Sequence, residues 1–155
     1  MTKRSEEVHT TGVLGNYLPF TQAVPILQRL ARSYNLVVVT SRRSLIRPET
    51  DRWLERYFPG IFQGIHYAGI YDSDDHIHNK LKQTKAELCR ELGVDYLIDD
   101  QLKHCVAAAE IGIKVLLFGD YNWNKADQLP DGIVRVKDWD EVERYFIDVR
   151  VETEE

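Results

Sequence analysis

Cysteine is scarce in this sequence, with two residues in a chain of 155. Cys89 and Cys105 form no metal-like CxxC pair and fall in expected helices, so we predict reduced structural thiols without a disulfide framework. No apolar run approaches the length of a membrane span, which argues against a membrane protein or a membrane partner. The first seven residues lack the apolar core of a secretory signal, so a cytoplasmic location is expected.

Positively charged residues are also fewer than negatively charged ones. The chain has 20 lysines and arginines against 25 aspartates and glutamates, giving a formal charge of −5. Binding to a phosphate backbone needs a basic face, so nucleic acid is not an expected partner, although a small anion at a local site is compatible. With 43% hydrophobic and 29% charged residues, the chain has the composition and the length of one globular domain.

Helical and strand patterns alternate along the chain. Residues 36–39 form a continuous apolar run that includes three β-branched valines, typical of a strand buried on both faces. Further strands are expected at 65–68, 96–100, 114–119 and 132–136, and helices at 21–33, 48–57, 85–93, 101–111 and 138–149. This order predicts an α/β fold: a three-layer, Rossmann-like parallel sheet with helices on both faces and a site at the carboxyl ends of the strands. Residues 18–150 would form the domain, with an N-terminal segment at 1–17 and a frayed acidic tail at 151–155.

Three polar features lie where such a site would form. Thr40 and Ser41 end one strand, Asp99 and Asp100 end another, and Lys85 opens the helix before the second strand, where Thr84 and Glu87 have the form of a capping box. Hydroxyls and backbone N–H groups hold phosphate oxygens, carboxylates suit Mg²⁺, and a lysine offsets phosphate charge. The pattern therefore predicts a phosphate and Mg²⁺ site.

Each feature also has a simpler structural interpretation. Thr40 and Ser41 could cap a helix, and Lys85 could be exposed to solvent. Asp100 could cap the helix at 101–111, which Gly112 would end, with Asp99 solvated. We favour the joint site because the three features occur together.

The order and wording of these segments resemble the haloacid dehalogenase superfamily of phosphohydrolases, and within it the 5′-nucleotidase (deoxyribonucleotidase-like) branch. The matching segments, over residues 18–142, are VVVTSR at 37–42, KAELC at 85–89, LIDD at 97–100, LLFG at 116–119 and YNWN at 121–124. The resemblance implies that Thr40 and Ser41 bind phosphate, with Arg42 at the rim. It implies that Lys85 stabilises the transferred charge and that Asp99 and Asp100 bind Mg²⁺. The implied catalytic residues are thus Thr40 and Lys85, and the implied substrate is a small phosphate monoester such as a nucleoside monophosphate.

One motif of that family is absent. Its members begin with a strand ending in Asp-x-Asp, which supplies the nucleophile and the general acid and base, but no Asp precedes Asp51 here. His9 and Thr11 could align with the two carboxylates, and His9 could act as a substitute nucleophile. We favour instead a chain that begins after the nucleophile segment, with residues 5–17 ending a cap or linker.

The absent strand also has a physical consequence. The resemblance places it in the centre of the sheet, between the strands at 36–39 and 96–100, so its loss would expose two strand edges. This would favour a borrowed strand, a homodimer or marginal stability. Two functions follow from the same residues: a phosphohydrolase, or an inactive domain that binds a phosphate ligand or a protein partner.

Other candidates carry weaker signals. Six Asp and His side chains could form a metal cluster, but a solvated acidic loop is favoured; they are His66, Asp72, Asp74, Asp75, His76 and His78. Trp123, with Asn122 and Asn124, could line the site, or Trp123 could pack against the end of the sheet. Trp53, Tyr57 and Phe58 have the spacing of a helix's core face.

Overall fold

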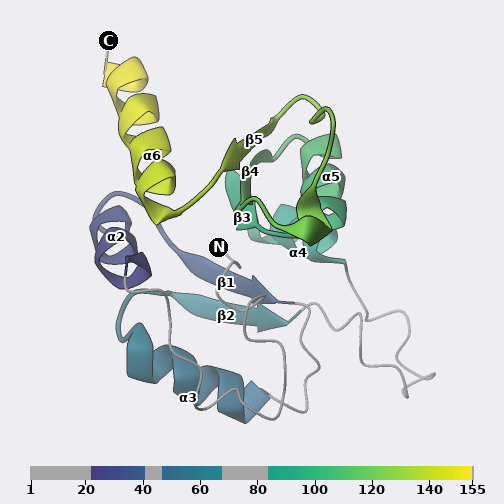
Figure 1. Ribbon diagram of the computed structural model, residues 1–155. Helices are drawn as coiled ribbons and strands as arrows, with labels where there is room; N and C mark the ends of the chain where they lie inside the picture. The colour runs from purple at the N-terminus through teal and green to yellow at the C-terminus, as the bar shows by residue number, and fades with distance from the viewer. Residues whose placement is uncertain (1–21, 41–46, 68–83, 155) are drawn as a thin grey trace, which may run out of the picture.

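Helices and strands alternate in the computed structural model, which describes residues 22–40, 47–67 and 84–154 (Figure 1). The helices are α2 (Ala23–Leu30), α3 (Arg47–Tyr57), α4 (Lys85–Leu92), α5 (Leu102–Glu110) and α6 (Trp139–Glu154), with a short 3-10 helix η4 (Asn122–Asn124). The strands are β1 (Val37–Thr40), β2 (Gly64–Tyr67), β3 (Tyr96–Asp99), β4 (Lys114–Phe118) and β5 (Ile133–Val136). The predicted α/β order is confirmed.

All strand pairings in the described part of the chain are parallel, as predicted. Val37 lies opposite Gly64 in the β1–β2 pair, and Tyr96 lies opposite Lys114 in the β3–β4 pair. Strand β4 also pairs with β5, so the described strands form two sheets, β1–β2 and β3–β4–β5. The division falls between β1 and β3, where the sequence resemblance places a further strand.

Two hydrophobic cores cover opposite faces of both sheets. One core joins α2, α3 and α6 to one face, and the other joins α4 and α5 to the opposite face. Strands β1, β3, β4 and β5 contribute side chains to both cores in alternation, because successive side chains of a strand point to opposite faces of the sheet. The first core takes Val38, Ile98, Leu116, Phe118 and Val136, and the second takes Val39, Leu97, Val115, Leu117 and Ile133. The three-layer architecture is therefore confirmed.

The ends of the helices confirm some of the predicted caps and contradict others. Thr84 Oγ1 accepts a hydrogen bond from the N–H of Glu87 at 3.1 Å, and Gly93 ends α4 at a φ of 71°. The predicted cap at Asp100 is wrong, since α5 starts at Leu102 and its N-cap is Gln101, in an extended conformation. Helix α6 continues to Glu154, so residues 151–154 belong to the last helix and not to a frayed tail.

Several expected core residues are buried. Trp53 and Phe58 are each 2% exposed and Tyr57 is half-buried, which confirms the predicted core face of α3. Cys89 and Cys105 are free and buried, as expected. No helix in the described ranges is long and apolar enough to cross a membrane.

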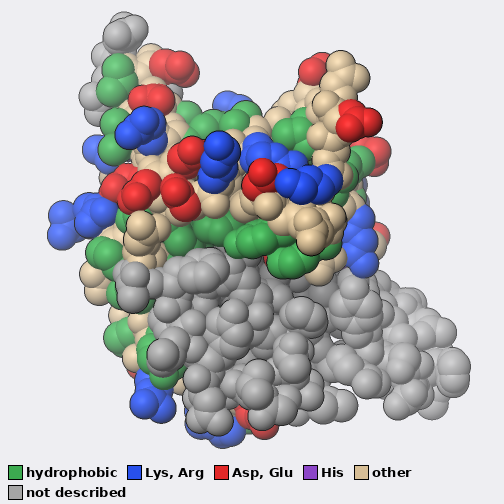
Figure 2. All heavy atoms as spheres, in the orientation of Figure 1, with side chains coloured by type: hydrophobic (Ala, Val, Ile, Leu, Met, Phe, Trp, Pro, Cys, Tyr) green, Lys and Arg blue, Asp and Glu red, His purple; other side chains and the backbone are tan. Residues whose placement is uncertain are grey.

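Charges are mixed on the face shown in Figure 2. Lysine and arginine side chains lie beside aspartate and glutamate side chains across the described surface there, rather than gathering into a basic patch. One such contact joins two helices, where Arg29 of α2 pairs with Glu143 of α6. Among the described residues on this face, the positive side chains form no continuous patch of the kind that binds a phosphate backbone.

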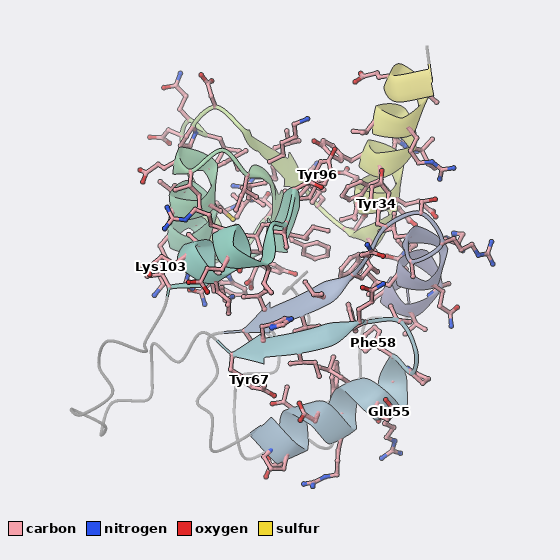
Figure 3. All side chains as sticks on the ribbon, turned by 180° about the vertical axis from the view of Figure 1, so that it is seen from behind. Tyr34, Glu55, Phe58, Tyr67, Tyr96 and Lys103 are labelled. Atoms are coloured by element: carbon pink, nitrogen blue, oxygen red, sulfur yellow. The ribbon has the colours of Figure 1, made fainter. Side chains whose placement is uncertain are left out.

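A cavity of about 480 Å³ opens at the amino ends of β1 and β3. Tyr34 and Tyr96 line it, with ring centroids 6.3 Å apart (Figure 3). This is the edge opposite to the one reached by Asp99 and Asp100, so we do not assign the phosphate chemistry to this cavity.

Candidate functional site

A buried ion pair lies at the carboxyl end of β3. Lys85 Nζ donates to Asp99 Oδ2 at 2.8 Å, and both side chains are 0% exposed. The strand sets this direction, because Asp99 faces the same way as Leu97, whose side chain packs in the core beneath α4 and α5. The cap at Thr84 begins α4 at Lys85 and so places the lysine opposite Asp99. The simpler interpretation, with an exposed Lys85 and a solvated Asp99, is wrong.

The Asp99 carboxylate is held in its ionised form. Burial alone would raise its pKa, but the Lys85 ammonium and the hydrogen bonds to the carboxylate lower the pKa below its ordinary value. Its second oxygen, Oδ1, accepts the N–H of Gln101 at 2.9 Å. Both oxygens of Asp99 are therefore engaged by donors of the chain itself.

Asp100 is fixed by a different set of groups. Its side chain is 3% exposed, and its Oδ2 lies 3.3 Å from the indole Nε1 of Trp123, which donates to it. Its backbone carbonyl accepts a hydrogen bond from Asn124 Nδ2 at 3.1 Å. The turn that follows β4 thus holds both the main chain and the carboxylate of Asp100.

Asn124 forms hydrogen bonds to the main chain at the ends of both β3 and β4, beside Asp100. Its Nδ2 also donates to the carbonyl of Phe118, at 3.0 Å, and its Oδ1 accepts the N–H of Tyr121 at 2.9 Å. Arg135 of β5 donates to the carbonyls of Asn124 and Gly119. The sequence prediction missed these roles of Asn124 and Arg135; the only available signal was the polar turn directly after a buried strand.

His104 is a second residue that the sequence did not single out. It is 7% exposed, on the first turn of α5, and burial together with the nearby Lys85 charge lowers its pKa to about 4. Its imidazole is therefore neutral at pH 7. The thiols of Cys89 and Cys105 remain protonated at that pH, because burial raises the pKa of both, and a protonated thiol is a poor nucleophile.

The remaining predicted residues divide into two groups. Thr40 is 1% exposed at the end of β1, the strand against which α4 packs, so it shares the edge with Lys85. Ser41, Arg42 and His9 lie outside the described residues. So does the acidic loop apart from His66, and the described ranges contain no group of three or more His, Cys, Asp or Glu side chains that could hold a metal ion.

The carboxylates at the end of β3 nonetheless fit Mg²⁺ if Asp100 is the direct ligand. Mg²⁺ usually keeps several waters and binds through one or two carboxylates together with substrate phosphate. Asp100 supplies a suitable carboxylate at the strand end. Asp99 fits less well as a direct ligand, because its oxygens already accept from Lys85 and from the Gln101 N–H.

Solved structures with this fold are known. No family model and no curated protein matches the sequence. A haloacid dehalogenase-like family hydrolase from Streptococcus pneumoniae is similar, with a TM-score of 0.56 and 21% identity over 82% of this chain and 59% of that one. An L-2-haloacid dehalogenase gives a TM-score of 0.60 and 16% identity over 88% of this chain and 60% of that one.

These likenesses settle the class of fold. The chain has the haloacid dehalogenase-like α/β fold expected from its sequence and spans about three fifths of the length of each of the two structures. The carboxyl edge that carries Asp99 and Asp100 is where ligands bind in open parallel sheets.

Proposed function

We propose that this chain is a Mg²⁺-dependent phosphohydrolase-type domain that acts on a small phosphate monoester, with the attacking nucleophile supplied from outside the described residues and nucleoside monophosphates as the first candidate substrates. The observation that carries the proposal is the Lys85–Asp99 pair, buried at 2.8 Å beside Asp100 at the carboxyl edge of the sheet. A fully buried lysine and two adjacent buried carboxylates are costly to keep unless the arrangement has a use. The free, buried cysteines support a reducing compartment, the cytoplasm.

Each residue has a part in the proposed chemistry. Thr40 and Ser41 bind the phosphate oxygens with Arg42 at the rim, and Lys85 offsets the charge on the transferring group. Asp100 holds Mg²⁺, which would neutralise phosphate charge when bound. We assign Asp99 the role of fixing the Lys85 ammonium, with any contact to the metal made through water.

A second candidate rests on one observation from the sequence. No Asp precedes Asp51, so residues 1–50 contain no carboxylate of the Asp-x-Asp kind. A domain with the same edge and no nucleophile would bind a phosphate ligand, or a protein partner, without turnover.

Hydrolysis assays separate the two functions. We would measure phosphate release from nucleoside monophosphates and an aryl phosphate, with and without Mg²⁺, for the chain and for Asp100→Asn. The phosphohydrolase predicts release that needs Mg²⁺ and is lost in the variant. Phosphate binding without release would favour the inactive domain, and neither binding nor release would remove both.

A further inference from the structure

Trp123 lies beside Asp100 and is the most exposed of the large hydrophobic residues in the described part of the chain. The residue is 62% exposed, whereas the tryptophans at 53 and 139 are almost fully buried. Its indole edge faces the site, because Nε1 donates to Asp100 Oδ2. Any group that lies on this ring therefore lies next to the carboxylate proposed to hold Mg²⁺.

A second ring supports the indole from behind. Tyr121 stacks on Trp123 with ring centroids 4.4 Å apart and an angle of 10° between the planes. Gly119 makes room for this arrangement, since it has a φ of +85° and a Cβ there would clash with the Tyr121 ring. One face of Trp123 is thus covered by Tyr121 and the indole is fixed parallel to it.

The turn that carries both rings is anchored in the protein. Asn124, which is 0% exposed, bonds to the ends of β3 and β4, and Arg135 of β5 bonds to the carbonyl of Asn124 at 2.8 Å. A side chain on such a turn loses little further freedom when a ligand stacks on it. The pair of rings is preorganised.

We propose that the exposed face of Trp123 binds a flat aromatic group of the substrate, such as a nucleobase or an aryl ring, while the substrate's phosphate lies at Lys85 and Asp100. This inference rests on the proposed function. Stacking on an aromatic side chain tolerates different bases because every base has a π-face. Trp123 would accordingly favour aromatic phosphate monoesters over purely aliphatic ones, without selecting one base.

Binding of two matched ligands tests the assignment. We would titrate the whole chain with adenosine 5′-monophosphate and with ribose 5-phosphate, which lacks only the base, in the presence of Mg²⁺. The wild-type chain should bind the nucleotide about tenfold more tightly than the sugar phosphate. Trp123→Ala should abolish that ratio, and Trp123→Phe, which keeps a ring but lacks the N–H, should retain most of it.

Other outcomes separate the inference from its foundation. Ile147→Ala, a truncation of an exposed side chain on α6, is the control and should keep the wild-type ratio. A ratio near one in the wild type, or an unchanged ratio in Trp123→Ala, overturns the stacking role and leaves the phosphate site standing. Absence of binding by both ligands to the folded wild-type chain overturns the proposed function and the stacking role together.

Discussion

Lys85 has no contact with solvent, and its charge is tolerated because Asp99 lies 2.8 Å away. Neither side chain would be stable alone at this depth, since burying an isolated ion is far more costly than burying a pair. The pair couples the start of α4 to the end of β3 at the candidate site. The sequence could place both residues at this edge from the cap at Thr84 and the buried strand, but the two hydrogen bonds that engage Asp99 depend on packing that no local pattern records.

Removal of the lysine should be severe. Lys85→Met leaves the Asp99 carboxylate buried without its counter-charge, so we expect the free energy of unfolding to fall by about 3–5 kcal/mol. Urea denaturation at pH 7 measures the change. Lys103→Met, at an exposed position on α5 (Figure 3), is the matched control and should change the free energy by less than 1 kcal/mol. A cost below 1 kcal/mol for Lys85→Met would contradict the buried pair.

His104 predicts a second effect, on the pH dependence of stability. Its pKa is lowered from an ordinary 6.5 to about 4, so the unfolded chain binds more protons than the folded chain between these values. The folded state is therefore most stable above pH 6.5, and its free energy of unfolding falls as the pH falls from 6.5 towards 4. The lowered pKa of Asp99 adds a further loss below its ordinary value of 3.8.

Denaturation of two histidine variants between pH 7 and 4 tests this account. His104→Gln should show a shallower fall in the free energy of unfolding than the wild type, because it lacks the titrating imidazole. His66→Gln, on β2, is the control and should keep the wild-type slope. Identical slopes for all three proteins would show that His104 does not carry the effect.

At the scale of elements, local signals predicted α4 well and α5 less well. The Thr84 hydroxyl and Gly93 lie within the sequence of α4 and its flanks, so they could be recognised without knowledge of the fold. The start of α5 could not, because the helix begins one residue later than expected, at Leu102, and the Asp100 carboxylate accepts a hydrogen bond from Trp123, which is 23 residues further along the chain. Long-range hydrogen bonds of this kind also explain why the anchoring roles of Asn124 and Arg135 were not predicted.

The cap of α4 gives a prediction at this scale. Thr84→Ala removes the acceptor for the Glu87 N–H, and we expect the free energy of unfolding to fall by about 1 kcal/mol. Thr84→Ser keeps the hydroxyl and should lose much less. Thermal or urea denaturation measures both variants, and equal losses would mean that the hydroxyl does not cap the helix. Since Lys85 is the first residue of α4, the alanine variant should also weaken phosphate binding.

Across the whole molecule, continuous apolar strands predicted parallel sheets covered on both faces, and the two cores confirm this arrangement. Such strands are buried on both sides, so their pattern is readable without homologues. The position of the division between the β1–β2 and β3–β4–β5 sheets matches the expected place of a further strand, which came from the resemblance and not from periodicity. The acidic loop and residues 1–21 lie outside the described chain, so the predictions made for them remain predictions.

A homodimer is the corresponding prediction for the whole molecule. If a strand is missing at the division, a second copy could cover the edges, and association would stabilise the fold. Sedimentation velocity over a range of protein concentrations measures the mass directly, and a dimer that dissociates on dilution together with a fall in melting temperature is expected. A monomer at all concentrations with high thermal stability would argue against it.

The most direct test of the account is calorimetric titration of Mg²⁺ into the chain in the presence of inorganic phosphate, with Asp100→Asn beside it. We predict that Mg²⁺ and phosphate each strengthen the binding of the other, since Asp100 would hold the metal and the metal would neutralise charge on the anion, and that the variant loses this coupling while remaining folded. Independent binding of the two ions, or coupling that survives in Asp100→Asn, would contradict a phosphate and Mg²⁺ site at the carboxyl edge of the sheet.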